Sequence, residues 1–90
     1  MRLLRLQIKI IFQRIGSIED TTPIEIQSSP DEKVSTIIEK YRNISFDLDP
    51  NKKFIFKDKE LNPSLFLSEA GITDYSVIFV VKFEKIPDNI

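Results

Sequence analysis

FIFKDKELNPSLFLSEAGITDYSVIFVV, residues 54–81, is the stretch that decides the fold of this chain. It begins with the apolar triplet Phe54, Ile55 and Phe56 and closes with an apolar run over residues 78–81. Turn-forming residues lie between these two ends, so the stretch predicts a strand, a tight turn, a short edge strand, a loop and a final strand. Successive side chains of a strand point to opposite faces, and only one face is expected to pack on a core.

The chain before this stretch predicts a hairpin. Over residues 4–12, an apolar residue at every even position alternates with Arg5, Gln7, Lys9 and Ile11 on the outward phase, which indicates a first strand with one buried face. The alternation resumes at Ile24 and Ile26 after a connection over residues 13–22 that is rich in turn formers. This connection is too long for a two-residue turn, so we expect a loop there.

A helix is predicted after the hairpin. Ser29 supplies an N-cap, Pro30 suits the first helical position, and Glu32 completes a capping box. An apolar stripe with helical spacing is then expected to face the sheet: Val34, Ile37, Ile38 and Tyr41. We expect the helix to run to about Arg42, with Asn43 in the left-handed conformation that ends such helices.

The segment between the helix and residue 54 mixes apolar and acidic residues. Ile44, Phe46 and Leu48 alternate with polar residues, which predicts that they tuck under the helix or form a small strand. Asp47 and Asp49 are spaced as calcium ligands are, but the glycine and distal glutamate of a calcium loop do not follow. We therefore interpret this segment as a solvated acidic loop.

Hairpin, helix and two further strands make the order ββαββ. This order predicts an α+β domain of the β-grasp class, in which one helix packs across one face of a mixed sheet. A chain of 90 residues has room for one core and no second domain.

Composition excludes several functions. The chain has no cysteine and no histidine, which removes disulfides, imidazole bases and nearly every zinc site, so we expect neither an enzyme nor a cofactor. A net charge of −1 favours neither nucleic acid nor an anionic membrane as a partner. No apolar run approaches the roughly 20 residues of a bilayer span, and no signal peptide is recognised. We expect a cytoplasmic or nuclear protein.

Residues 54–81 resemble the C-terminal half of ubiquitin in their spacing. The residues that carry the resemblance are Phe54, Ile55, Phe56, the turn Lys57, Asp58, Lys59, the corner Leu67, Ser68, Glu69, then Ile72 and residues 78–81. The resemblance implies one ubiquitin-like domain over residues 1–86, with its first and last strands parallel at the sheet centre, and a tail or linker start over residues 87–90. Conjugation would need a tail ending in Gly-Gly. Ile86 and Pro87 take those positions, so we expect a non-conjugated domain.

The resemblance also implies a binding surface. If Phe54 and Phe56 point to the helix, alternation turns Ile55 away from it, together with Phe79 and Val81 on the last strand. These three residues match the positions where ubiquitin displays the apolar patch that most of its receptors use. Lys53 and Lys57 border this face, either as a solvated rim or as charges that steer an acidic amphipathic helix.

The function predicted is that of a non-catalytic adaptor, or scaffold, that binds a protein partner through this apolar face. The alternative is a structural subunit permanently incorporated in a large assembly through the same face. Binding of a small GTPase through an edge strand is a third, lesser interpretation. No small-molecule substrate is expected.

Overall fold

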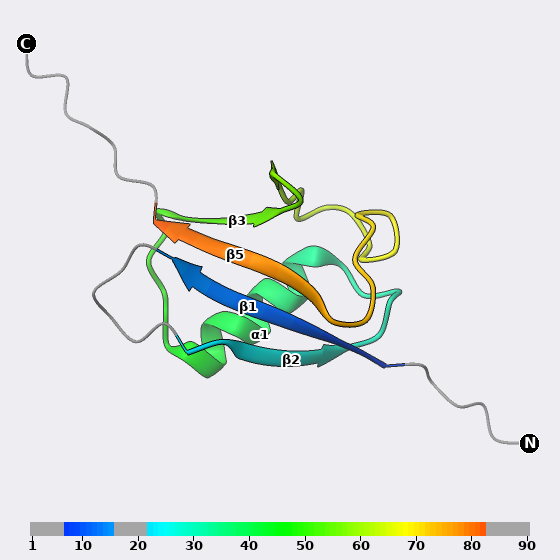
Figure 1. Cartoon of the computed structure of the whole chain (residues 1–90), viewed down its shortest axis with the longest axis horizontal. Helices are drawn as coiled ribbons and strands as arrows, with labels where there is room; N and C mark the ends of the chain where they lie inside the picture. Colours follow the sequence, from blue (N-terminus) through cyan, green and yellow to red (C-terminus); the bar gives the residue numbers. More distant parts are fainter. Residues whose placement is uncertain (1–6, 16–21, 83–90) are drawn as a thin grey trace, which may run out of the picture.

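Alternating apolar and polar residues build a mixed sheet crossed on one face by a helix. A computed structural model describes residues 7–15 and 22–82, and Figure 1 shows the helix α1 lying along one side of the sheet. The helix spans Val34–Ser45. The strands are β1 (Ile8–Ile15), β2 (Ile24–Ser28), β3 (Lys52–Phe56), β4 (Lys59–Glu60) and β5 (Ser76–Lys82).

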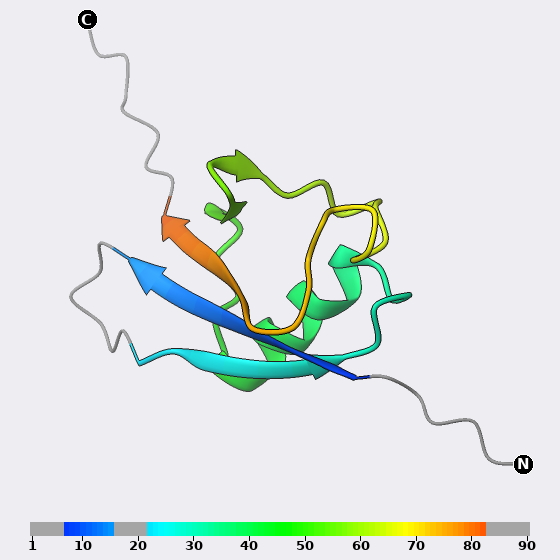
Figure 2. The ribbon, with the colours of Figure 1, turned by 45° about the vertical axis from the view of Figure 1, so that its right-hand side comes forward.

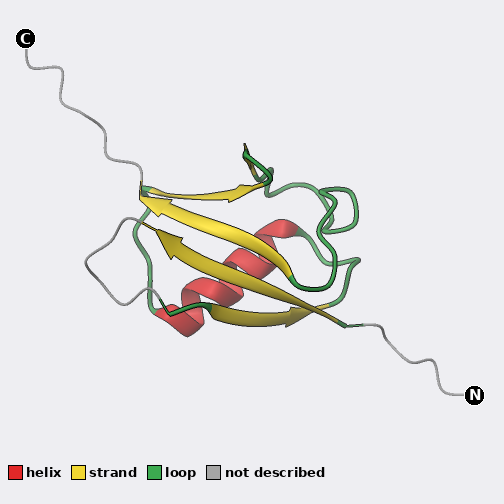
Figure 3. Cartoon of the chain, viewed as in Figure 1, coloured by secondary structure: helices red, strands yellow, loops and turns green. Residues whose placement is uncertain are grey.

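The strand order is β2-β1-β5-β3-β4. The central strands β1 and β5 are parallel, and the other neighbours are antiparallel. Figure 2 shows, from a second direction, that α1 covers one face only, and Figure 3 shows the short β4 beyond β3. The predicted α+β, β-grasp class is confirmed, with the first and last strands side by side at the centre.

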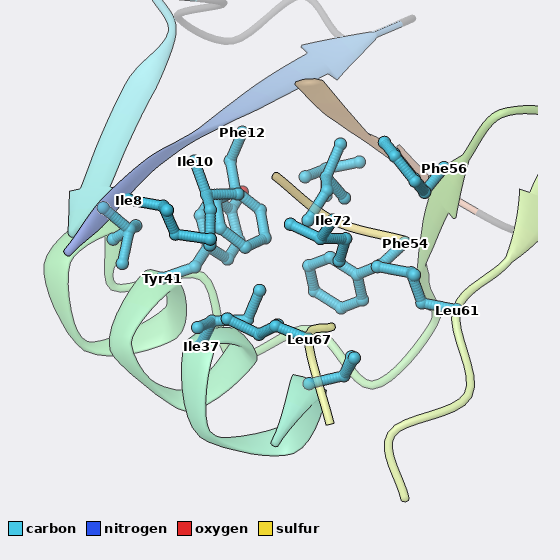
Figure 4. Close-up of a cluster of buried hydrophobic side chains, with 14 residues drawn as sticks. Ile8, Ile10, Phe12, Ile37, Tyr41, Phe54, Phe56, Leu61, Leu67 and Ile72 are labelled. Carbon is cyan, nitrogen blue, oxygen red and sulfur yellow. The ribbon is translucent and has the colours of Figure 1, made fainter. Parts of the chain in front are cut away.

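Three aromatic rings form the centre of the core between the sheet and α1 (Figure 4). Phe12 stacks on Tyr41 with ring centroids 4.8 Å apart, and Phe54 meets both rings edge-on at 6.0 and 5.7 Å. Aromatic pairs prefer these offset and edge-on geometries. As predicted, the inward side chains of the helix and the last strands are buried: Val34, Ile37, Tyr41, Phe54, Phe56, Ile78 and Val80. Ile38 packs at the margin of this core.

The helix begins later than predicted. Lys33 is extended, with φ −83° and ψ 154°, because it bridges Phe66 of the loop that follows β4. The N–H of Val34 donates to the Leu65 carbonyl at 2.9 Å, and that of Ser35 donates to the Pro63 carbonyl at 3.1 Å. Carbonyl oxygens of a distant loop thus satisfy the first helical N–H groups, and Ser29 does not cap the helix.

The proposed capping box forms a separate turn before the helix. The Glu32 carboxylate accepts hydrogen bonds from the Ser29 N–H at 3.1 Å and the Ser28 hydroxyl at 2.8 Å. These bonds lower the pKa of Glu32, with the Ser28 bond contributing most. The glutamate contact of a capping box is therefore present, but it stabilises a turn before α1 and does not cap the helix.

Two further boundaries differ from the prediction. α1 continues to Ser45, and Phe46 rather than Asn43 takes the left-handed conformation, with φ 57°. β1 extends through residues 13–15, which we expected in a loop, because parallel pairing with β5 satisfies their backbone groups. Residues 1–6, 16–21 and 83–90, including Ile86 and Pro87, lie outside the described residues.

Candidate functional site

The face of the sheet opposite α1 carries a group of apolar side chains that we call the open-face patch, and on β1 the polar Gln13, which pairs with Phe79, interrupts it. Its members come from three adjacent strands: Ile11, Ile15, Ile55, Val77, Phe79 and Val81. Their exposure ranges from half-buried to 44% for Ile15, with Phe79 at 39%. The inward neighbours on the same strands are buried, so strand alternation alone places these side chains on the open face.

Strand register brings the patch together. Phe79 pairs with Ile55 across the antiparallel β3–β5 ladder. On the other side of β5, Val77 pairs with Ile11 and Val81 with Ile15 in the parallel ladder. The three apolar residues predicted for the site, Ile55, Phe79 and Val81, therefore lie on adjacent strands of one face.

The two predicted lysines lie at one border of this face. Lys53 pairs with Val81 across the ladder, and its Nζ lies 3.6 Å from the Glu60 carboxylate. Lys57 lies in the β3–β4 turn in a left-handed conformation, φ 52°, with its Nζ 5.3 Å from the Phe56 ring centroid. Lys57 is the more exposed of the two cations.

Sequence reasoning missed Ile11 and Ile15. Ile15 lay in the segment expected to be a loop, and Ile11 was counted among the outward residues without being assigned to a site. The available signal was Ile11 itself, since an isoleucine on the outward phase of a half-buried strand departs from simple alternation.

A hollow of about 380 Å³ adjoins the patch next to Phe79. It lies between the β3–β4 turn and the loop before β5, with Phe56, Lys57 and Tyr75 among its lining residues. Tyr75 is held in a left-handed conformation, φ 65°, because its N–H donates to the Lys9 carbonyl at 2.6 Å. The Lys9 Nζ lies 5.7 Å from the centroid of the Tyr75 ring.

The end of α1 and the loop after it contradict the prediction that their apolar residues tuck under the helix or form a small strand: Ile44 lies in α1, and the next strand begins at Lys52. Ile44, Phe46 and Leu48 are 57%, 86% and 73% exposed. The physical reason is that the space under the end of the helix is already filled by the Tyr41 ring, which is fully buried against Phe12.

A polar network holds this loop. The Asp47 carboxylate accepts a hydrogen bond from the Tyr41 hydroxyl at 3.0 Å and forms an ion pair with Lys52 at 2.9 Å. Burial raises the pKa of Asp47, but the bonds from Lys52 and Tyr41 outweigh this effect and the pKa lies below its ordinary value. Burial, with the bond to Asp47, raises the pKa of Tyr41 to about 12.

Within the described residues, no group of His, Cys, Asp or Glu side chains is arranged to hold a metal ion. In the same part of the chain, α1 lacks the length and apolar character needed to cross a membrane.

The fold defines a ubiquitin-like protein. Caldiarchaeum subterraneum ubiquitin superposes with a TM-score of 0.74 at 15% identity, over 90% of this chain and 99% of that one. A protein designed de novo on the basis of ubiquitin gives 0.72 at 17% identity, over 93% and 96% of the two chains. ATBAG1, solved in complex with HSP70, gives 0.71 at 20% identity; 84% of this chain covers 40% of ATBAG1.

The family is more specific than the fold. Residues 17–81, more than half of the chain, match the family described as "Ubiquitin-2 like Rad60 SUMO-like". The chain belongs to this family. No curated protein matches it in sequence.

Proposed function

We propose that this ubiquitin-like domain is a non-catalytic adaptor that binds a partner protein through the open-face patch. Ubiquitin-like folds generally do no chemistry themselves and often bind other proteins. The single observation that supports the site is the register, which places Ile55, Phe79 and Val81 on the adjacent strands β3 and β5, on the face that α1 does not cover. Contiguous exposed apolar surfaces mark interaction sites in soluble domains.

The charges at the rim suggest the chemistry of the partner. Lys57 lines the hollow that adjoins Phe79, and the Lys9 Nζ lies 5.7 Å from the ring centroid of Tyr75, another lining residue. An amphipathic helix with an apolar stripe and acidic flanks would match both the patch and these cations. Lys57→Glu should mainly slow association and change its salt dependence.

The test is a pulldown from native extract with wild type and Phe79→Ala side by side. Central apolar residues dominate such interfaces, so the replacement should weaken binding by about 2 kcal/mol, roughly thirtyfold in Kd. Glu39→Ala, on an exposed part of α1, is the matched control and should retain every partner. Retention of all partners by folded Phe79→Ala would remove the open-face patch as the binding site.

The alternative is a structural subunit of a large assembly, with the same face permanently buried. An adaptor should exchange with its partner, whereas a subunit should bury more surface and resist separation. Size-exclusion chromatography of native extract distinguishes the two. Elution of all the chain with one large assembly supports the subunit, and a substantial fraction at low mass supports the adaptor.

A further inference from the structure

A second apolar feature, which we call the Phe46 knob, lies outside the open-face patch. It consists of Ile44 in the last turn of α1 and Phe46 and Leu48 in the loop that follows. The Phe46 side chain is the most exposed large apolar group among the described residues, at 86%. Phe46 also has φ 57°, a conformation that bulky residues rarely adopt. An exposed aromatic ring on a strained backbone contributes little to the stability of an isolated chain, and such departures concentrate at functional sites.

The knob is held firmly. The Ser45 hydroxyl donates to the Tyr41 carbonyl at 2.7 Å and accepts from the Asp47 N–H at 3.2 Å. The Arg42 guanidinium donates to the carbonyls of Asp47 and Asp49 at 2.9 and 3.0 Å. The backbone on both sides of Phe46 is thus fixed, which lowers the entropy lost when the ring inserts into a partner.

A hollow that suits such a ring lies at the other end of the same molecule. Its apolar lining comes from Ile8, Pro30 and Ile72, with Ser68, Thr73 and Asp74 completing it. Its volume is about 340 Å³. Small-molecule pockets begin at about 300 Å³, so one aromatic side chain fits.

The two features cannot meet within one chain. In Figures 1 and 2 the loop over residues 46–51 lies at the end of the molecule where α1 stops, and residues 68–74 lie at the opposite end, near the start of β1. Asp47 and Asp49 beside the knob form ion pairs with Lys52 and Lys82, and the remaining charges beside the two features are of opposite sign. Arg42 lies at the base of the knob, bonded to neutral carbonyls, and Asp74 lies at the hollow, bonded to the neutral N–H of Lys9.

We propose that the Phe46 knob of one copy inserts into the hollow of a second copy in a head-to-tail contact. The occupant is another copy because both halves of the contact, matched in size and opposite in neighbouring charge, are present on one chain. Such a contact is heterologous, so each added copy leaves one knob and one hollow free, and short chains or a ring result. No member of the open-face patch lines the hollow that takes the knob, although Thr73 and Asp74 line both this hollow and the one beside Phe79. Assembly would therefore present several patches together and raise avidity for a multivalent partner.

Two variants test the contact from its two sides. Phe46→Gly removes the ring and suits the left-handed backbone, and Ser68→Arg places a charged side chain at the hollow from an exposed position. Analytical ultracentrifugation should show the mass of the wild type rising with concentration. Each variant alone should need at least a roughly tenfold higher concentration to associate, because one side of the contact is missing. An equimolar mixture of the two should form heterodimers and stop there, since only one productive knob-and-hollow pair is left.

The controls separate this contact from the other surfaces. Phe79→Ala, in the open-face patch, should associate as the wild type does, and circular dichroism verifies the fold of each variant. A wild type that is monomeric at millimolar concentration overturns the proposal, as does association of Phe46→Gly or Ser68→Arg at wild-type strength. Binding of monomeric wild type to phosphatidylserine vesicles, lost in Phe46→Gly, would instead assign the knob to a membrane surface.

Discussion

Asp47 is the residue on which the loop after α1 depends. Its carboxylate is largely buried, yet it accepts the Tyr41 hydroxyl and the Lys52 ammonium at 3.0 and 2.9 Å. Since these bonds favour the ionised form more than burial disfavours it, the pKa of Asp47 is lowered in the folded protein. Ionised Asp47 therefore joins the end of α1 to the start of β3.

We predict that Asp47→Asn weakens this junction in a pH-dependent way. The folded pKa lies below the unfolded one, so the stabilisation is present above the unfolded pKa and is lost as the pH falls through the folded pKa. The variant should lose about 1–2 kcal/mol at pH 7 and show a shallower decline below about pH 4. Urea unfolding at pH 7, 4 and 3 measures this. Asp58→Asn, in the exposed β3–β4 turn, is the control, and parallel pH curves for wild type and Asp47→Asn would contradict the prediction.

Replacing Phe46, the neighbour of Asp47, by glycine should raise the stability of the fold, whereas Asp47→Asn should lower it. A left-handed conformation costs a residue other than glycine about 1–2 kcal/mol, which a glycine would not lose. Glycine also makes the unfolded chain more flexible, and this offsets part of the gain in stability. Phe46→Gly should therefore raise the free energy of unfolding by up to about 1 kcal/mol, because an exposed ring contributes few contacts. Thermal melting by circular dichroism tests it. A clear loss of stability would show that the ring supports the fold.

At the scale of an element, the start of α1 shows where local sequence rules fail. Ser29, Pro30 and Glu32 satisfy the rules for a helix start, but the chain makes one turn there and begins the helix at Val34. The competing interaction is the bridge between Lys33 and Phe66, which holds Lys33 extended. Local spacing cannot predict a bridge between residues so far apart in the chain, because it arises only when the loop after β4 packs against α1.

In the turn before α1, Glu32 should contribute more to the free energy of unfolding than Ser29. Glu32 accepts hydrogen bonds from Ser28 and Ser29, whereas the Ser29 hydroxyl contacts only the nearby Asp31 carboxylate among its described hydrogen bonds. We expect Glu32→Ala to cost about 1 kcal/mol and Ser29→Ala less than about 0.5. Urea unfolding of both variants in one buffer gives the comparison. The reverse order would restore Ser29 as the cap of α1.

At the scale of the whole molecule, the sequence predicts well which face of a strand each side chain occupies. It predicts poorly which space in the fold is already filled by other side chains. Period-two alternation correctly separated Phe54 and Phe56 from Ile55, and the order of elements with the resemblance predicted the sheet. Alternation also suggested burial for Phe46, and this was wrong because the Tyr41 ring occupies the space under the helix. Whether the open-face patch binds a partner is still a prediction, since the fold shows only that its residues are adjacent.

Because α1 covers only one face of the sheet, neighbouring residues of β5 should contribute unequally to the free energy of unfolding. Ile78 is fully buried beneath α1, while Phe79 faces the open side and pairs with Ile55. Ile78→Ala should cost about 3 kcal/mol, a large part of the roughly 5–15 kcal/mol that stabilises a small domain. Phe79→Ala should cost about 1 kcal/mol or less, since it loses mainly a cross-strand contact. Chemical unfolding of the two variants measures both values. Equal losses would mean that the Phe79 ring supports the core, and reduced binding by Phe79→Ala would then reflect the fold instead of a lost contact with the partner.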